Sequence, residues 1–309
     1  MSRVLFVLCS VTLAHPALAA CAWEGSASSF FRCLMGVTET VDEHEERLNG
    51  LEDALWHLSD VTDDLTVRLE AVEGAGSAGG GGVMYGDVYI DNSIDLAALA
   101  GYTEITGNLS IYGSPPTLEG LEALTSVGGD LYISSPYLTH VDHLENLTTV
   151  GGDLEIYGSN ELTNLDGLTG LTEIGDDLAV MFTTGLTQLN GLNAVSTLGG
   201  SVRIESNTSL EQIDGLNGLV NTDLGVYIEG NDAMTSVGGL SALTSIGTDL
   251  QFKNNDTISS LTGLSSLSSV GTHMEIMNNP ALCQSAVDSV AAGVSVGTTT
   301  TITGNLDGC

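Results

Sequence analysis

The sequence predicts a mainly β protein, a β-solenoid of about nine 24-residue coils preceded by a long coiled-coil helix. The phrase GGDLEIYGSNELTNLDGLTGLTEI at 151–174 returns at a fixed interval, and residues 34–73 hold an unbroken heptad pattern. A period of this length is typical of solenoids, because one repeat cannot bury its apolar face without its neighbours.

The net charge of the chain argues against two classes of binding partner. The 309 residues include 40 acidic and 6 basic ones, a formal charge of −34. Such a chain repels the phosphates of nucleic acids and anionic lipid headgroups, so neither is expected to bind it. Beyond Arg68, the only lysine or arginine residues are Arg203 and Lys253.

Residues 1–20 read as a secretory signal peptide, with one arginine, a short apolar run and small residues before a cleavage site. The run is too short for a membrane span. Ala17-Leu18-Ala19 suits ordinary signal peptidase, whereas Leu18-Ala19-Ala20-Cys21 resembles the bacterial lipobox, in which Cys21 is acylated. Ordinary cleavage leaves four cysteines, an even set, whereas lipidation of Cys21 leaves one thiol unpaired. Both alternatives stay open, and both predict export to a bacterial envelope, its outer surface or the medium.

A coiled-coil stalk is expected at 34–73, after an N-terminal segment at 21–33. Apolar residues recur in alternating steps of three and four, a narrow seam that is typical of a coiled coil rather than a core helix. The rod would be about 60 Å long. Its expected oligomerisation contacts include Leu48, Leu51, Leu55, Leu58, Leu65 and Leu69.

Two segments bear on the number of strands in this coiled coil. Residues 47–52 and 68–73 resemble the Arg-h-x-x-h-Glu motif of short parallel three-stranded coiled coils, with Arg47 and Glu52 in the first copy. A homotrimer is therefore predicted, with a dimer as the alternative. His44 at a core position either sets the register or binds a metal, and the first is the more usual role. The Gly-rich residues 74–83 are expected to form a linker.

The solenoid is expected over 84–309. Units begin at 128, 151, 175, 199, 223, 247 and 271, with less regular copies near 85 and 106. Leu154 and Ile156 alternate with polar residues, as in a strand with one buried face. Leucine or isoleucine then returns at every third position to 174, a spacing that fits short flat sides joined by turns. Gly167 and its equivalents are expected at the corners.

Two columns of the repeat predict internal bonding. Asparagine recurs at the ninth position of the later units, at 207, 231, 255, 279 and 305. Amides stacked about 4.8 Å apart can bond along the solenoid. Cys283 and Cys309 each lie twelve residues past the start of their unit, so they should stack within the range of a disulfide that closes the last coil.

The repeat also resembles a known family. The phrase L-x-x-L-x-G-L-x-x-L-x-x-I-G-G-x-L-x-I, the later N-P-x-L-C and I-x-G-N-x-x-x-C are similar to the receptor L domains of insulin- and EGF-type receptors and of fungal cell-wall proteins. The resemblance covers about residues 85–309. It implies a right-handed β-helix related to leucine-rich repeats and a role in surface recognition or wall organisation. It implies no catalytic residue.

No arrangement of residues in the sequence indicates catalysis, a cofactor or a resident metal. His140, Asp142, His143 and Glu145 form a cluster of histidine and acid, for which a variable outer face is the simpler interpretation and a weak metal site the alternative. The aspartates at 130, 153, 177 and 249 lack the nonapeptide pattern of Ca²⁺-binding β-rolls. Tyr132, Tyr157 and Tyr227 are expected in one outward strand column, as the face for a shallow carbohydrate or protein contact.

The sequence therefore predicts an exported, non-enzymatic recognition or adhesion protein that displays solenoids on an oligomeric stalk. Its expected partners are itself and an unidentified surface protein or glycan, with a membrane only through a lipid on Cys21. A purely structural envelope spacer is the first alternative. A polysaccharide-active β-helix enzyme is the second.

Overall fold

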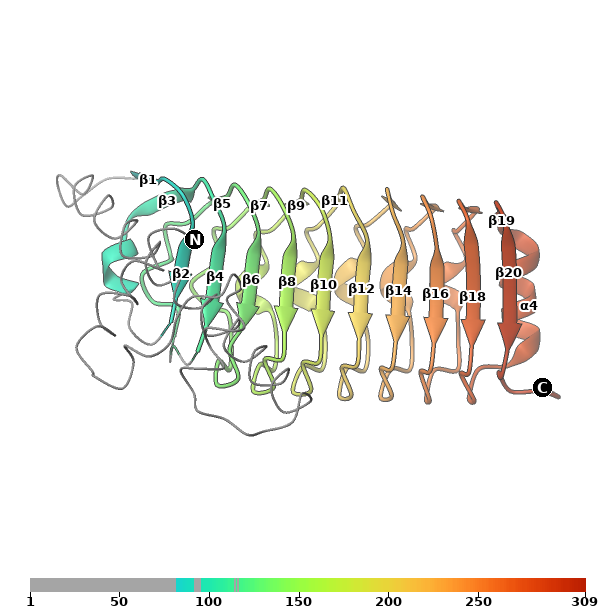
Figure 1. Cartoon of the computed structure of the whole chain (residues 1–309). Coiled ribbons are helices and arrows are strands. Elements are labelled where there is room, and N and C mark those ends of the chain that lie inside the picture. Colours follow the sequence, from blue (N-terminus) through green and yellow to red (C-terminus); the bar gives the residue numbers. More distant parts are fainter. Residues whose placement is uncertain (1–81, 92–95, 114, 116) are drawn as a thin grey trace, which may run out of the picture. The chain divides into compact units, whose positions relative to one another are not determined.

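The computed structural model describes residues 82–91, 96–113, 115 and 117–309. The chain divides into two compact units, Met1–Leu65 and Thr66–Cys309, and every described residue belongs to the second. There the chain winds into stacked coils, each of which adds a strand to a parallel sheet (Figure 1). The prediction of a mainly β solenoid is confirmed for this part. The predicted signal peptide, N-terminal segment and coiled-coil stalk lie outside the described residues, as does the linker up to residue 81.

The principal sheet contains ten parallel strands, one per coil. Leu178 pairs with Val202 and Val202 with Val226, so neighbouring strands are 24 residues apart in this region. The first strands are closer in sequence, since Val88 pairs with Leu109 and Leu109 with Leu131. The strands are β2 (Val88–Ile90), β4 (Leu109–Tyr112), β6 (Leu131–Ser134), β8 (Leu154–Tyr157), β10 (Leu178–Met181), β12 (Val202–Glu205), β14 (Val226–Glu229), β16 (Leu250–Lys253), β18 (His273–Met277) and β20 (Thr299–Thr303).

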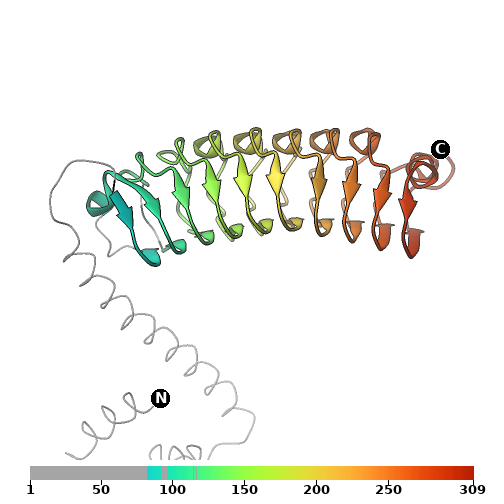
Figure 2. The same ribbon diagram turned by 90° about the horizontal axis from the view of Figure 1, so that it is seen from above.

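Two smaller parallel sheets and a row of 3-10 turns complete the coils (Figure 2). One sheet holds β1 (Gly82–Met84), β3 (Tyr102–Ile105), β5 (Ser126–Val127), β7 (Thr149–Val150), β9 (Glu173–Ile174) and β11 (Thr197–Leu198). The other holds β13 (Asn221–Thr222), β15 (Ser245–Ile246), β17 (Ser269–Val270) and β19 (Ser295–Val296). The turns are η1 (Leu96–Leu99), η2 (Asp166–Leu168), η3 (Asn190–Leu192), η4 (Asp214–Leu216), η5 (Gly238–Leu240) and η6 (Thr262–Leu264).

The core is a continuous column of leucine, isoleucine and valine. In β8 the buried Leu154 and Ile156 alternate with the less buried Glu155 and Tyr157, as the period of two in a strand requires. The apolar residues at every third position from 162 to 174 are also fully buried. Stacking coils removes each of these side chains from water, which is the main driving force for the fold.

Close contact between coils explains the corner glycines. A Cβ atom at Gly167 would overlap the carbonyl oxygen of Val141 in the preceding coil. The equivalent Gly191 faces the carbonyl oxygen of Leu165 in the same way. Glycine is therefore required here by the approach of backbone to backbone.

The asparagine column forms the expected internal ladder. The five side chains are at most 9% exposed. The Oδ1 atom of Asn231 accepts the amide of Asn207 at 3.1 Å, and the Asn207 Nδ2 atom donates to the carbonyl oxygen of Val180 at 2.9 Å. In earlier coils a serine hydroxyl replaces the asparagine amide as acceptor. There Ser159 Oγ accepts the amide of Ser135 at 3.1 Å. The ladder thus satisfies buried backbone groups along the turn.

A helix, α4 (Gln284–Gly293), covers the C-terminal end of the solenoid. Val287 is fully buried, and Val290 and Ala291 pack against the core. Cys283, just before the helix, is joined by a disulfide to Cys309, with Cα atoms 5.8 Å apart. The sequence did not predict this helix, which replaces the 3-10 turn of the regular coils.

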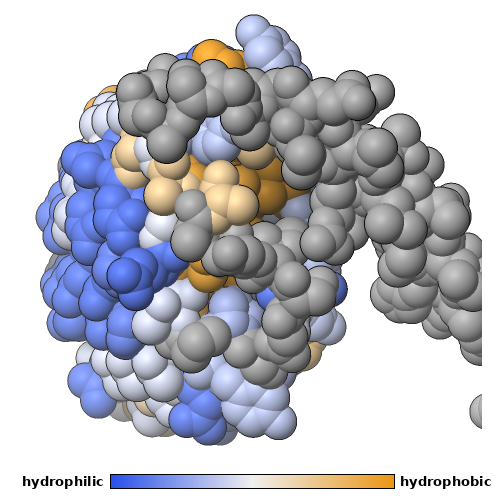
Figure 3. All heavy atoms as spheres, turned by 90° about the vertical axis from the view of Figure 1, so that its left-hand side faces the viewer, coloured by the Kyte–Doolittle hydropathy of each residue, from blue (hydrophilic) through white to orange (hydrophobic). Residues whose placement is uncertain are grey.

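The N-terminal end of the described solenoid, like the C-terminal end at β19 and β20, has strands with an unpaired edge. Among the described residues, β1 and β2 are the outermost strands of their sheets, with one unpaired edge each. Met84 and Val88 keep 8% and 7% of their surface accessible, most core residues farther along have none, and Val296 and Ile302 in the last coil are only partly buried. Figure 3 shows apolar residues near the middle of this end, with hydrophilic residues along one side. The first strand starts at Gly82, two residues before the predicted start of the solenoid.

Candidate functional site

The outer face of the principal sheet carries the side chains that distinguish one coil from the next. They form two rows, because outward residues alternate with buried ones along each strand. The first row is Tyr89, Ser110, Tyr132, Glu155, Ala179, Arg203, Tyr227, Gln251, Glu275 and Thr301. The second row is Tyr112, Ser134, Tyr157, Met181, Glu205, Glu229, Lys253, Met277 and Thr303.

The expectation that Tyr132, Tyr157 and Tyr227 share one column was wrong. Tyr132 pairs with Glu155, so Tyr157 lies two residues farther along its strand and belongs to the second row. All three still face outward, because a shift of two residues keeps a side chain on the same face. Tyr227 shares the first row with Tyr132 but lies four strands away.

The N-terminal half of this face carries a group of apolar side chains, named here the aromatic patch. It consists of Tyr112, Tyr132, Tyr157, Met181 and Phe182. The rings of Tyr112 and Tyr132 have centroids 5.2 Å apart, and those of Tyr157 and Phe182 are 5.4 Å apart. Tyr112 and Tyr157 are each 40% exposed and Phe182 is 46% exposed. Half-exposed aromatic rings in contact offer apolar surface to a ligand as well as to one another.

Phe182 has an unusual backbone conformation. Its φ angle is +55°, in the left-handed region. The same turn position in other coils holds residues that tolerate this region better, namely Gly158, Ser206, Gly230 and Asn254. A bulky side chain there costs free energy, and such strain is often retained for function. The ring of Phe182 is thus held beside Tyr157 at the expense of local strain.

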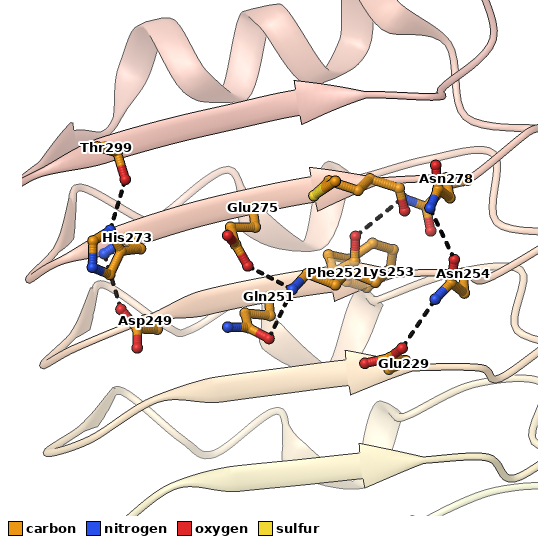
Figure 4. A network of polar contacts seen from close by, with 12 residues as sticks. Glu229, Asp249, Gln251, Phe252, Lys253, Asn254, His273, Glu275, Asn278 and Thr299 are labelled. Atoms are coloured by element: carbon orange, nitrogen blue, oxygen red, sulfur yellow. Dashed lines mark hydrogen bonds and ion pairs between the residues drawn. The ribbon is translucent and has the colours of Figure 1, made fainter.

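The C-terminal half of the outer face is polar and bonded to itself (Figure 4). Lys253 forms an ion pair with Glu275 and donates to Gln251 Oε1 at 3.1 Å. Asn254 Nδ2 donates to Glu229 Oε1 at 2.9 Å, and Asn278 Nδ2 donates to Asn254 Oδ1 at 3.2 Å. A ligand would have to displace these contacts, whereas the rings of the aromatic patch offer their faces directly.

Arg203 and Tyr227 lie between the two halves. The guanidinium carbon is 4.5 Å from the centroid of the Tyr227 ring, which is cation–π geometry. Arg203 also pairs with Glu205 at 3.6 Å. One face of Tyr227 is therefore covered, which makes it a weaker ligand contact than Tyr157.

A column of carboxylates lies directly before the starts of β6, β8 and β10 and accepts backbone amides. Asp130 Oδ1 accepts the amide of Asp153 at 2.9 Å, and Asp153 Oδ1 accepts that of Asp177 at 2.7 Å. Burial raises the pKa of Asp153, and the neighbouring aspartates raise it further. Burial likewise raises the pKa of Glu155, and the carboxylates of Asp153 and Asp130 add to the shift. The column thus concentrates negative charge beside Tyr132.

The two histidines of the predicted cluster contact different acids. His140 Nδ1 lies 3.2 Å from Asp142 Oδ2, and His143 Nδ1 lies 3.1 Å from Glu122 Oε1. Within the described part of the chain, no three histidine, cysteine, aspartate or glutamate side chains come together as metal ligands. Nor does any helix there have the length and apolar character to cross a membrane.

A groove lies between α4 and the coil at 259–267. It is an open groove of about 440 Å³, lined by side chains that include Leu261, Leu264, Ser289 and Val290. No charged or titratable side chain lines it. The groove offers hydroxyl groups but no acid or base to activate them, so the aromatic patch is the stronger candidate site.

Several predicted site residues lie outside the described part of the chain. They are Cys21, Arg47, Leu48, Leu51, Glu52, Leu55, Leu58, Leu65 and Leu69. No protein-family model matches the chain, and no curated protein matches its sequence. The resemblance to receptor L domains therefore stays a prediction.

Proposed function

We propose that this chain is an exported, non-enzymatic recognition or adhesion protein of a bacterial envelope, which binds a surface glycan or protein through the aromatic patch. In this proposal the solenoid is a right-handed, receptor L-domain-like β-helix. It is displayed on a homotrimeric stalk, with a dimer as the alternative. A lipid on Cys21 tethers it, or ordinary cleavage releases it.

One observation supports binding most directly, the strained Phe182 ring beside Tyr157. The chain places glycine, serine or asparagine at the equivalent turn in the other coils where φ is positive, yet keeps a half-exposed phenylalanine here. Exposed aromatic side chains are the residues that most often anchor a partner. The polar groups of the C-terminal half, by contrast, are occupied with one another.

The spacer alternative draws on that same C-terminal half. There the outer side chains bond to one another and the buried asparagines bond within the solenoid, so these polar groups stabilise the fold and are not free for a ligand. The enzyme alternative draws on the raised pKa values of Asp153 and Glu155. The Oδ1 atom of Asp153, however, is used by the backbone amide of Asp177.

Retention on surfaces tests the proposal. Full-length protein is applied to immobilised polysaccharides, glycoproteins and envelope fractions, beside a Tyr112→Ala/Tyr157→Ala double variant. Tyr227→Ala is the matched control, a tyrosine of the same face with one ring face already covered. We expect the wild type and the control to be retained and the double variant to be lost, with similar melting temperatures. Retention of the double variant would refute the patch, and no retention of any form would favour the spacer.

A further inference from the structure

The rings of the aromatic patch follow the axis of the solenoid. Successive strands β4, β6 and β8 carry Tyr112, Tyr132 and Tyr157, which alternate between the two outer rows. Phe182 lies in the turn directly after β10. One aromatic ring is thus presented per strand, at a spacing of about 4.8 Å along the axis. A hexopyranose unit in an extended chain advances by nearly the same distance.

Small side chains separate the rings within each row. Ser110 lies between Tyr89 and Tyr132, and Ser134 follows Tyr112 in the second row. Ser110 is almost fully buried, at 7% exposed, and so lies deeper than the rings on either side of it. These positions leave a shallow floor between rings, so a ligand can lie along the row instead of crossing it.

The charged side chains near the aromatic patch indicate which class of ligand it can bind. Glu155 lies in the first row beside Tyr132, and the Asp130, Asp153 and Asp177 column lies directly before the starts of β6, β8 and β10. Neither Arg203 nor Lys253 belongs to the patch, and both have acidic partners. An anionic polymer would be repelled, whereas the hydroxyl groups of a neutral sugar can donate to the Glu155 carboxylate.

The angles between the rings favour a single polysaccharide chain over a crystalline polysaccharide surface as the ligand. The planes of Tyr112 and Tyr132 differ by 41°, and those of Tyr157 and Phe182 by 60°. A flat crystal face could lie on only one ring of each pair. A single chain can rotate about its glycosidic bonds and place successive sugars on rings of different tilt. An α-1,4-linked chain curls, whereas a β-1,4-linked chain stays extended.

From spacing, charge and tilt together, we propose that the aromatic patch binds a single extended chain of a neutral β-1,4-linked polysaccharide, laid along the solenoid axis over β4–β10. The inference rests on the proposed function and names its ligand class. Sugar faces stack on Tyr112, Tyr132, Tyr157 and Phe182. Stacking on an aromatic ring combines apolar contact with polarised C–H groups and needs no charge on the ligand.

The test is calorimetric titration of the full chain with soluble cello- and chito-oligosaccharides of two to eight units. Affinity should rise with length and level off at about four units, one per strand over β4–β10. Tyr157→Ala should weaken binding of the hexasaccharide by roughly 3- to 10-fold, since one stacking contact is lost. Tyr157→Phe, which keeps the ring, and Tyr227→Ala should bind like the wild type. The melting temperature of each variant shows that it is folded.

Other ligands complete the experiment. Oligogalacturonate of the same length should not bind, and crystalline cellulose should retain little protein. Equal binding of the anionic oligosaccharide, or binding to the crystalline form alone, would overturn the inference. So would loss of affinity in Tyr227→Ala as large as in Tyr157→Ala. If surface retention depends on Tyr157 but neutral oligosaccharides neither bind nor compete, the proposed function stands and the glycan assignment falls.

Discussion

The buried asparagine ladder can be broken at Asn255, which lies in its middle. Its Oδ1 atom accepts the amide of Asn231 at 3.0 Å, and its Nδ2 atom donates to the carbonyl oxygens of Ile228 at 3.1 Å and Lys253 at 2.9 Å. In Asn255→Ala the Asn231 amide loses its acceptor inside the protein, which costs about 1–3 kcal/mol. Each lost donor bond costs about 0.5–1.5 kcal/mol more, so we expect the free energy of unfolding to fall by about 2–6 kcal/mol.

Two measurements on the full chain check this value. Denaturant unfolding followed by circular dichroism gives the change in stability, and hydrogen exchange reports the Asn231 amide itself. Asn255→Ser is the matched control, because a hydroxyl already accepts a backbone amide at this ladder position, in Ser159. Serine should therefore cost about half as much as alanine. An unchanged midpoint together with unchanged protection of the Asn231 amide would show that the ladder does not hold the turn.

Three further changes have defined outcomes. Because the folded chain raises the pKa of Asp153 and Glu155, it holds those protons more tightly than the unfolded chain, and stability should fall as the pH rises from about 4 toward neutrality. Thermal melting across pH should show this slope, and Asp153→Asn should flatten it; a steeper slope in the variant would contradict the assignment. Peptide mapping without reduction should recover the Cys283–Cys309 pair, and Cys283→Ser should destabilise the last coils by up to about 3–4 kcal/mol, given a separation of 26 residues. Leu51→Pro should convert a trimer to monomers with the solenoid still folded, which light scattering detects; a monomeric wild type would exclude the stalk.

The period of the repeat carried most of the correct prediction. A spacing of 24 residues places Leu154, Leu178 and Val202 at equivalent positions, and strand pairing follows from that alignment. The buried asparagines follow for the same reason, since a column of identical polar residues in an apolar repeat can bond to its own copies and to the backbone of neighbouring coils. A structural feature that recurs in every repeat can be predicted from the sequence, because the aligned copies show the same residue type at the same position.

Features that occur once were harder to predict. The helix α4 replaces a turn at one end, and its signal is the glycine-free stretch at 284–292 with apolar residues at 287, 290 and 291. The grouping of Tyr112 with Tyr132 depends on the pairing of two irregular early coils, whose spacings are shorter than 24. The strained turn at Phe182 could have been found by aligning it with Gly158, Gly230 and Asn254, residues that favour positive φ.

The aromatic patch lies on the coils nearest the end at which the chain enters the solenoid, and this position has a mechanical consequence. If the aromatic patch binds a ligand as proposed, tension between residue 82 and that ligand passes only through the first coils, and the coils from β12 onward carry no load. Each coil of a solenoid is held mainly by its neighbours, so the loaded coils would detach one after another. A coil of 24 residues releases roughly 80 Å of extended chain. A sudden pull would therefore unfold the loaded coils in steps. The disulfide-bonded C-terminal coils would stay folded, and the unfolded coils could refold against them.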